Sequence, residues 1–370
     1  MENKIEKLKE TVNKIFLNDI KDYIFIYTPP KVGSTTLVSS LRVSLGKSYN
    51  VIHIHDDIML NVLTGINDVT VNEIIDFLGF QGKNVYVIDV YRSPIERKMS
   101  EFFEKISPYH FNNSEENINN YSIKRVTNRF NKIFPYLALG DHYFDKYLLS
   151  DPIPFDFNKK YTIQQVNNIK YIKLRLCDSH SWNTILSQIF KADIVLISDY
   201  QTDNKGISDL YRKFKKEYKI PINFFNLIRS CKFFNFYYSE DERKKYLTIW
   251  INKIAEKFIY YTEEEYNFYV TIYLENQYIN DIQINHYIDN GCFCKLCCSK
   301  RKELFFKAKN GEKNFEPIIH NDVVNKEFDN RRNHIIQAVN KQIHKKFTPN
   351  QFSINALNKE KKGIDKRSHF

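Results

Sequence analysis

The sequence predicts an α/β fold, in which a parallel β-sheet is flanked by helices and followed by a polar, basic C-terminal appendage. Five short apolar runs rich in Ile, Val and Tyr are bounded by polar or turn residues, which is typical of strands. Helical patterns lie between or after these runs, and alternating strands and helices form parallel sheets covered on both faces. Beyond about residue 265 this alternation fades and polar residues dominate, which indicates the appendage.

Length and composition set the expected domain organisation. The chain has 370 residues, of which 42% are hydrophobic and 15% aromatic, enough to build a substantial core. The first residues are amphipathic and charged, unlike a secretory signal, and no stretch approaches the roughly 18 apolar residues of a membrane span. We expect an amphipathic helix at 1–20, an α/β domain at 21–264 and a Cys-containing basic region at 265–370. The protein is expected to be soluble and cytoplasmic, with no transmembrane segment.

The expected strands and helices follow from local patterns. The strands are predicted at residues 23–27, 51–55, 85–90, 171–176 and 194–198. The helices are predicted at residues 35–45, 71–78, 93–103, 204–218 and 239–261. Two of these helices begin with the Ser-x-x-Glu pattern of a capping box, at Ser93 and Ser239. The first also has Pro94 at its first position, where proline is favoured.

The helix predicted at 239–261 carries an apolar stripe at helical spacing, which we expect to pack against the sheet. The stripe consists of Leu247, Trp250, Ile251, Ile254 and Phe258.

The first strand leads into a loop that suits phosphate binding. The loop reads Thr28-Pro29-Pro30-Lys31-Val32-Gly33-Ser34-Thr35-Thr36. Gly33 lets the backbone approach an anion, and the following helix offers N–H groups and the positive end of its dipole. Ser34, Thr35 and Thr36 add hydroxyl donors, and Lys31 adds a mobile positive charge. The loop is P-loop-like but is not a Walker A motif, in which the Lys follows the Gly. An ordinary strand-to-helix turn is the alternative.

A second motif follows the third strand. It reads Tyr91-Arg92-Ser93-Pro94-Ile95-Glu96-Arg97-Lys98-Met99-Ser100. Arg92 comes just after the carboxyl end of a strand, where open α/β sheets bind ligands. Ser100 lies two helical turns beyond Ser93, on the same face. Arg92 and Ser100 can therefore clamp one phosphate group; a surface arginine and a helix serine without a shared role are the alternative.

Together the two motifs resemble the sulfotransferase family that uses 3′-phosphoadenosine 5′-phosphosulfate. The resemblance rests on Lys-x-Gly-[Ser/Thr]-Thr after the first strand and Arg-x-Pro-x-x-Arg-x-x-Ser after the third. It is closer to the carbohydrate-type branch, in particular to sulfotransferases of capsular polysaccharide synthesis, through the segments at 141–145, 172–176 and 236–240. It covers roughly residues 20–262 and leaves out the C-terminal region.

The resemblance implies transfer of a sulfuryl group from this nucleotide to a hydroxyl, of a carbohydrate or another acceptor. It assigns the 5′-phosphosulfate to Lys31, Gly33, Ser34, Thr35 and Thr36. It assigns the 3′-phosphate to Arg92 and Ser100. No metal is required if a cation neutralises the leaving oxygen, and Lys31 is our candidate for that catalytic role.

A general base should take the proton of the acceptor hydroxyl. Residues 51–57 read Val-Ile-His-Ile-His-Asp-Asp, and the two-residue period of a strand puts His53 and His55 on one face. His55 is nearest the ligand edge, and imidazole titrates near neutral pH. Asp56 and Asp57 are alternatives, or orient His55. A structural histidine, bonded to a neighbouring carboxylate, is also compatible with the pattern.

The C-terminal region has two further features. Four of the six cysteines are Cys292, Cys294, Cys297 and Cys298, and they bind zinc only if other ligands complete the set. Residues 291–370 also hold 18 Lys and Arg against 8 Asp and Glu, so they carry most of the net charge of +11. This excess is compatible with an anionic partner such as a polymer, a membrane surface or nucleic acid, or with a solvated tail.

Two other functions remain open from the sequence. The first is a P-loop-like nucleotide kinase, against which the lack of a Walker A motif argues. The second is a non-enzymatic protein that binds anions or nucleic acid through its basic C-terminal region.

Overall fold

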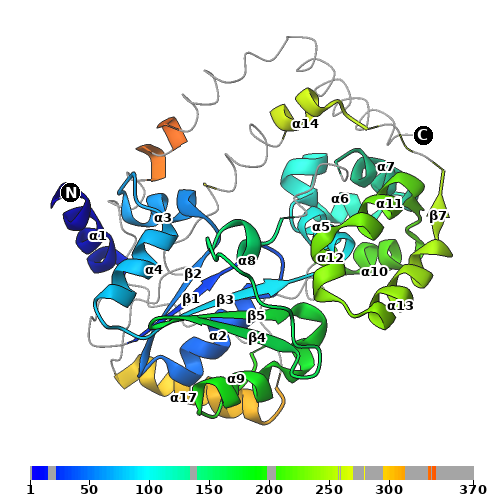
Figure 1. Ribbon diagram of the computed structural model, residues 1–370. Helices are drawn as coiled ribbons and strands as arrows, with labels where there is room; N and C mark the ends of the chain where they lie inside the picture. The colour runs from blue at the N-terminus through cyan, green and yellow to red at the C-terminus, as the bar shows by residue number, and fades with distance from the viewer. Residues whose placement is uncertain are drawn as a thin grey trace. The chain divides into compact units, whose positions relative to one another are not determined.

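The computed structural model describes residues 2–15, 22–133, 140–197, 206–256, 258, 260–269, 279, 295–312, 332–334 and 336–338. The chain divides into two compact units (Figure 1). The first unit consists of Met1–Arg92, Gly140–Tyr200 and Ile279–Ile335, and it contains the main sheet. The second consists of Ser93–Leu139, Gln201–Tyr278 and Ile336–Phe370, and its described part is mainly helical. The boundary expected near residue 265 stays a prediction.

The main sheet has five strands in the order β2-β1-β3-β5-β4. The strands are β1 (Asp22–Tyr27), β2 (Tyr49–Ile54), β3 (Val85–Tyr91), β4 (Tyr161–Val166) and β5 (Ile169–Arg175). β1 is parallel to β2 and β3, and β3 is parallel to β5, whereas β4 pairs antiparallel with β5. The predicted α/β class and the first four strands are thus confirmed.

Helices cover both faces of this sheet (Figure 1). On one face, α2 (Ser34–Leu45) and α9 (Trp182–Phe190) bury aliphatic side chains against alternate residues of β1, β3 and β5. The other face carries α3 (Asp57–Thr64), α4 (Val71–Phe80) and the short α8 (His142–Asp145). Helix α1 (Glu2–Ile15) packs against α3 and α4, and α17 (Lys295–Lys309) against α2. The helices expected at 35–45 and 71–78 are therefore present, and the described part of the helix expected at 1–20 is helical over Glu2–Ile15.

The strand expected at 194–198 is wrong for its described part, because residues 194–197 form no strand and residue 198 lies outside the described residues. Three of its side chains are buried as a strand pattern demands: Ile194, Val195 and Ile197. Their backbone N–H groups, in the same order, donate at 3.1, 3.2 and 2.9 Å to the hydroxyls of Ser187, Ser44 and Ser40. Serines of the covering helices therefore satisfy donors that would otherwise need a neighbouring strand.

Strand β4 was not predicted from the sequence. Its residues read Tyr-Thr-Ile-Gln-Gln-Val, and only one of them is buried. An antiparallel edge strand can expose one face to water, so it lacks the continuous apolar run that marked the other strands.

The second unit has a helical, aromatic core. Its helices are α5 (Pro94–Glu104), a π-helix (Ile106–Phe111), α6 (Glu115–Asn119), α7 (Ile123–Ile133), α10 (Ser208–Glu217), α11 (Ile222–Ser230), α12 (Lys232–Tyr237), α13 (Glu240–Ile251) and α14 (Glu263–Tyr269). Two-residue strands, β6 (Ile220–Pro221) and β7 (Ile254–Ala255), pair in parallel. Phe130 contacts Phe102 and Phe214 edge-on, with ring centroids 5.4 and 5.3 Å apart.

One of the two expected capping boxes forms. At α13, Ser239 accepts the Glu242 backbone N–H and the Glu242 side chain accepts the Ser239 N–H. At α5, Pro94 occupies the first turn as predicted, but the Ser93 side chain makes no capping bond. Its hydroxyl donates to the Glu96 carboxylate instead, which also accepts the Tyr246 hydroxyl at 2.7 Å. The carboxylate is thus held by side chains and the expected box at α5 is wrong.

The apolar stripe predicted on 239–261 is also wrong as a continuous helical face. Helix α13 ends at Ile251, which is 54% exposed, and Ile254 lies in β7. Only Trp250 of the helical part is buried, and it packs against the ring of Tyr218 at 6.0 Å rather than against the sheet.

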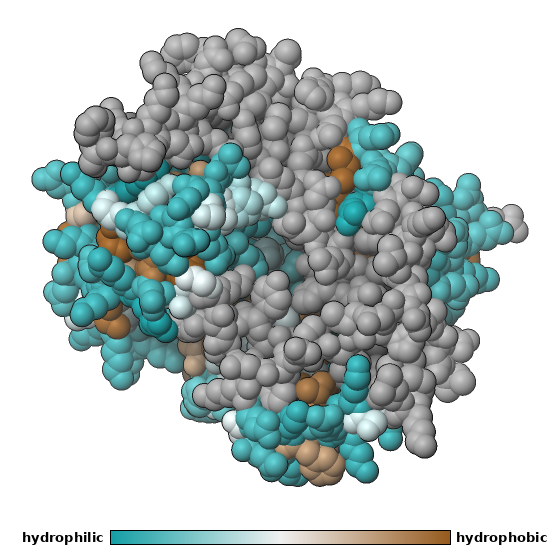
Figure 2. All heavy atoms as spheres, turned by 180° about the vertical axis from the view of Figure 1, so that it is seen from behind, coloured by the Kyte–Doolittle hydropathy of each residue, from teal (hydrophilic) through white to brown (hydrophobic). Residues whose placement is uncertain are grey.

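Figure 2 shows hydrophilic side chains over most of the described surface on one face, with hydrophobic side chains in small groups. Among the described helices, none has the length and apolar character needed to cross a membrane.

Candidate functional site

The candidate site lies at the carboxyl edge of the parallel strands in the first unit. At the ends of β1 and β2, Tyr27 pairs with Ile54, and at the ends of β3 and β5, Tyr91 pairs with Arg175. Because β1 also pairs with β3, the carboxyl ends of all four strands lie along one edge. The residues that follow them gather at this edge, which is where open α/β sheets bind ligands. Two groups of residues meet here: the loop after β1, and a buried polar network beneath the strand ends.

The loop after β1 requires glycine at position 33. Gly33 has φ +89° and is the N-cap residue of α2. A Cβ atom there would lie 2.8 Å from Cδ1 of Leu176 and 3.2 Å from the Trp182 ring. Lys31 also has a positive φ, +66°, which is uncommon for a residue with a side chain. The loop is therefore a tight, specified turn rather than a generic connection.

Helix α2 begins immediately after Gly33, with the three hydroxyl residues Ser34, Thr35 and Thr36 in its first turn. Its N-cap residue is Gly33, which has no side chain to accept the N–H groups of the first turn, and that turn holds no acidic residue. The N–H groups of a first helical turn have no intrahelical partners, and the dipole makes this end positive. These features suit the binding of an anion, as the sequence predicted.

Arg92, from the second motif, reaches the loop of the first motif. Its Nη1 donates to the main-chain oxygen of Lys31 at 2.8 Å, across 61 residues of sequence. The resemblance assigned these two residues to opposite ends of one nucleotide, and the contact shows that Arg92 lies at the same edge of the sheet as the loop. Ser100 is buried in α5 of the second unit, so its clamp with Arg92 stays a prediction.

The two candidate histidines share a face of β2 and its end. Their rings are 4.5 Å apart in a T-shaped arrangement, and His53 and His55 are 1% and 7% exposed. The Nδ1 atom of His55 lies 2.6 Å from the main-chain oxygen of Thr28. A carbonyl oxygen only accepts, so Nδ1 carries the proton and Nε2 is the basic nitrogen of neutral His55. This tautomer suits a general base.

The carboxylates that follow His55 have structural contacts of their own. Asp56 caps α3 by accepting the Met59 backbone N–H at 2.8 Å, and Asp57 accepts that of Val71, also at 2.8 Å. The His55 ring itself contacts the Thr28 carbonyl and the ring of His53.

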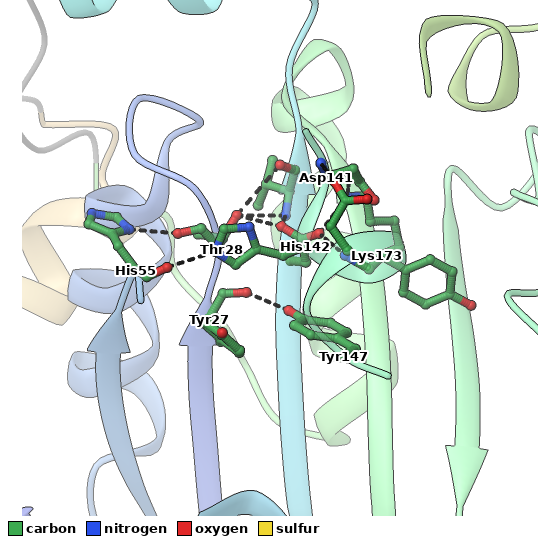
Figure 3. A network of polar contacts seen from close by, with 11 residues as sticks. Tyr27, Thr28, His55, Asp141, His142, Tyr147 and Lys173 are labelled. Atoms are coloured by element: carbon green, nitrogen blue, oxygen red, sulfur yellow. Dashed lines mark hydrogen bonds and ion pairs between the residues drawn. The ribbon is translucent and has the colours of Figure 1, made fainter. Parts of the chain in front are cut away.

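A buried ion network lies beneath the strand ends (Figure 3). The ammonium group of Lys173, on β5, contacts the carboxylates of Asp141 and, at 2.5 Å, of Asp89 on β3. All three side chains are at most 1% exposed. Burial opposes ionisation of Asp89, but the charges of Lys173 and His142 and the hydrogen bonds from Lys173 and Thr28 outweigh it and lower the pKa of this carboxyl.

This network connects directly to the loop after β1. The Thr28 hydroxyl donates to Asp89 Oδ1 at 2.6 Å and accepts the Val90 backbone N–H at 3.0 Å. Asp89 Oδ2 also accepts the backbone N–H of Tyr143 at 3.1 Å. Figure 3 shows the start of the loop, the strand ends and α8 joined through these contacts.

Four residues of this network were not predicted as site residues from the sequence: Asp89, Asp141, His142 and Lys173. The segments at 141–145 and 172–176 supported the resemblance alone, and the structure brings them together through Lys173 and Asp141. One signal was present: a lysine inside an apolar run that should be a central, fully buried strand needs a buried partner. For His142 the sequence gave no such signal.

Metal ligands do not gather in the described part of the chain: no group of three or more His, Cys, Asp or Glu residues there could hold an ion. Cys292 and Cys294 lie outside the described residues, and the side chains of Cys297 and Cys298 also do. The zinc hypothesis for these four cysteines stays open.

Comparison of the chain with protein-family models, curated proteins and solved structures gave no match.

Proposed function

We propose that the protein is a sulfotransferase that uses 3′-phosphoadenosine 5′-phosphosulfate and modifies a hydroxyl group, in particular of a carbohydrate. The observation that carries the proposal is the contact between Arg92 and the Lys31 carbonyl, because it brings an arginine of the second motif to the loop of the first. The positive φ of Gly33 and the uncapped start of α2 support the same assignment for the loop.

The residues of this edge have separate roles in the proposed reaction. The bound nucleotide supplies the sulfuryl group, whose bond to a phosphate oxygen breaks as a bond to the acceptor oxygen forms. Lys31 stabilises the negative charge that builds on the leaving phosphate oxygen. His55 takes the acceptor's proton on Nε2, since Nδ1 is bound to the Thr28 carbonyl. No metal ion is needed for these roles.

The donor assignment is tested by thermal stability with different nucleotides and no added metal. We expect adenosine 3′,5′-bisphosphate to raise the melting temperature clearly more than AMP, because AMP lacks the phosphate assigned to Arg92 and Ser100. Stabilisation by ATP with Mg²⁺ but not by the bisphosphate would favour a nucleotide kinase instead. Salt-sensitive binding of polyanions that is lost without residues 291–370, and no nucleotide effect, would favour a non-enzymatic anion-binding protein.

The catalytic assignments are tested by turnover at saturating donor. Lys31→Ala should lower turnover as well as donor affinity, because charge develops on the leaving oxygen in the transition state. His55→Ala should lower turnover by roughly two to four orders of magnitude and leave bisphosphate affinity nearly unchanged. His53→Ala and Asp56→Asn are the comparison variants. Near-normal turnover in His55→Ala, with a large loss in Asp56→Asn, would make the carboxylate the base.

A further inference from the structure

His142 makes a contact that the roles above do not use. Its Nε2 atom lies 2.7 Å from the main-chain oxygen of His55, 87 residues away in the sequence. Because a carbonyl oxygen only accepts, Nε2 of His142 donates this bond. The Thr28 carbonyl binds the ring of His55 and His142 binds its backbone, so two contacts from different segments constrain the candidate base (Figure 3).

The helix that carries His142 cannot be stable alone. α8 spans four residues, far fewer than an isolated helix needs in water. Its start is instead held by buried charge: Asp141, the residue before it, pairs with Lys173, and Asp89 accepts the Tyr143 backbone N–H at 3.1 Å. The Asp141 backbone N–H also donates to Asp145 at 2.7 Å. The ion network therefore fixes the position of His142.

The same network also fixes the contact on the ring side of His55. Asp89 accepts the Thr28 hydroxyl at 2.6 Å, and the carbonyl of Thr28 binds Nδ1 of His55. The carboxylate of Asp89 thus supports both contacts to His55. It supports the ring contact through Thr28, and the backbone contact through α8 and His142. Loss of the Thr28 contact removes a bond to the ring, whereas loss of the His142 contact removes a bond to the backbone, which places the ring against Thr28.

We infer that His142 is a positioning residue for His55, and that the buried Asp89–Lys173–Asp141 network holds it in place for that purpose. The inference rests on the proposed function, in which His55 is the base. A displacement of about 1 Å of a catalytic group can cost roughly 100-fold in rate, so such support has a measurable consequence.

The test compares His142→Ala, His142→Gln and His142→Asn. The Gln amide nitrogen can reach the position of Nε2 and donate to the His55 carbonyl, whereas the shorter Asn amide cannot. We expect turnover to fall by up to about 100-fold in the Ala and Asn variants, and Gln to restore most of it. Bisphosphate affinity should change less than twofold in all three. Equal turnover in Gln and Ala variants would overturn the inference.

A double variant distinguishes positioning from independent catalysis. In a His55→Ala background, His142→Ala should lower turnover no further, because the residue it positions is already gone. If the two losses multiply, His142 acts independently of His55 and the inference is wrong.

A spectroscopic measurement judges the inference without enzymatic activity. Nitrogen chemical shifts of labelled histidine should show neutral His55 protonated on Nδ1 in the unaltered protein and in His142→Gln. The Ala and Asn variants should show a mixture of both tautomers. The same tautomer in all four proteins would overturn the inference. Failure of the bisphosphate to bind would instead overturn the proposed function and leave this measurement valid.

Discussion

The two groups of residues at the sheet edge are built on different physical principles. The loop around Lys31 and Gly33 is specified by backbone conformation: two positive φ angles, a close approach to Leu176 and an uncapped helix start. The network around Lys173 is specified by buried charge, with side chains at most 1% exposed. The first is continuous in the sequence, whereas the second comes from three distant segments.

This difference indicates how each group contributes to a site. The N–H groups at the start of α2 have no intrahelical partners, so under the proposed function the loop gains contacts when an anion binds. In the network, the described carboxylates and ammonium satisfy one another, so it does not need a ligand to be stable. We therefore expect changes in the loop to act mainly on binding, and changes in the network to act on stability and on the placement of His55.

The largest expected effect is on stability, from Lys173→Met. This change leaves the carboxylates of Asp89 and Asp141 buried without their cation, and breaking a buried pair from one side costs about 3–5 kcal/mol. The matched control is Lys309→Met, which removes an exposed pair with Asp193 at 2.6 Å and should cost less than about 1 kcal/mol. Unfolding in urea measures both. Similar costs for the two variants would contradict the role given to the network.

A smaller effect is expected on ligand affinity, from Arg92→Ala. Loss of a hydrogen bond to a charged group costs about 1.5–3 kcal/mol, so bisphosphate binding should weaken by roughly 10- to 150-fold. Calorimetry with the bisphosphate and with AMP separates two causes. If Arg92 binds the 3′-phosphate, the preference for the bisphosphate over AMP falls. If Arg92 only holds the loop through the Lys31 carbonyl, both affinities fall equally.

Arg42→Ala is the control for this measurement. Arg42 also donates to a main-chain oxygen, that of Val51 at 3.3 Å, but it lies in the last turn of α2, away from the carboxyl edge. Its removal should leave the affinities for both nucleotides unchanged.

A modest effect on stability is expected from Gly33→Ala. A left-handed conformation costs an L-residue about 1–2 kcal/mol, and the new Cβ would also press on Leu176 and Trp182. Gly82→Ala is the matched control, because Gly82 has φ +75° but no atom within 4 Å of the added Cβ. We expect the larger unfolding cost and a loss of bisphosphate affinity at Gly33 only. Equal behaviour of the two variants would show that the close approach is unimportant.

The smallest and most gradual effect is the response to acid. The folded-state pKa of Asp89 is below its ordinary value of about 3.9, so its contribution to stability is complete above that value. It is lost as pH falls through the lower folded-state pKa. The unfolding free energy of the unaltered protein should therefore exceed that of Asp89→Asn by an amount that shrinks below about pH 4. A constant difference down to pH 3 would contradict this direction.

Local pattern was enough for the elements whose partners are close in sequence. The four parallel strands and α2 follow from apolar runs and from the loop at 28–36, and the capping box of α13 follows from Ser239 and Glu242 three residues apart. The same reasoning erred at 194–197, where helix serines replace a strand, and at Ser93, whose hydroxyl contacts Glu96. At 194–197, serine hydroxyls accept the backbone N–H groups that the pattern assigned to a neighbouring strand. At Ser93, the hydroxyl bonds the Glu96 side chain instead of the Glu96 backbone N–H.

By itself, the sequence determined that Gly33 lies in a turn before a helix, that His53 and His55 share a face, and that Arg92 follows a strand. Each is a consequence of backbone geometry over a few residues. Only the tertiary structure decided that Lys173 pairs with Asp89 and Asp141, that His142 binds the His55 carbonyl, and that Arg92 reaches Lys31. These contacts join residues 32 to 87 positions apart, and the order of the strands, which no local pattern encodes, brings them together.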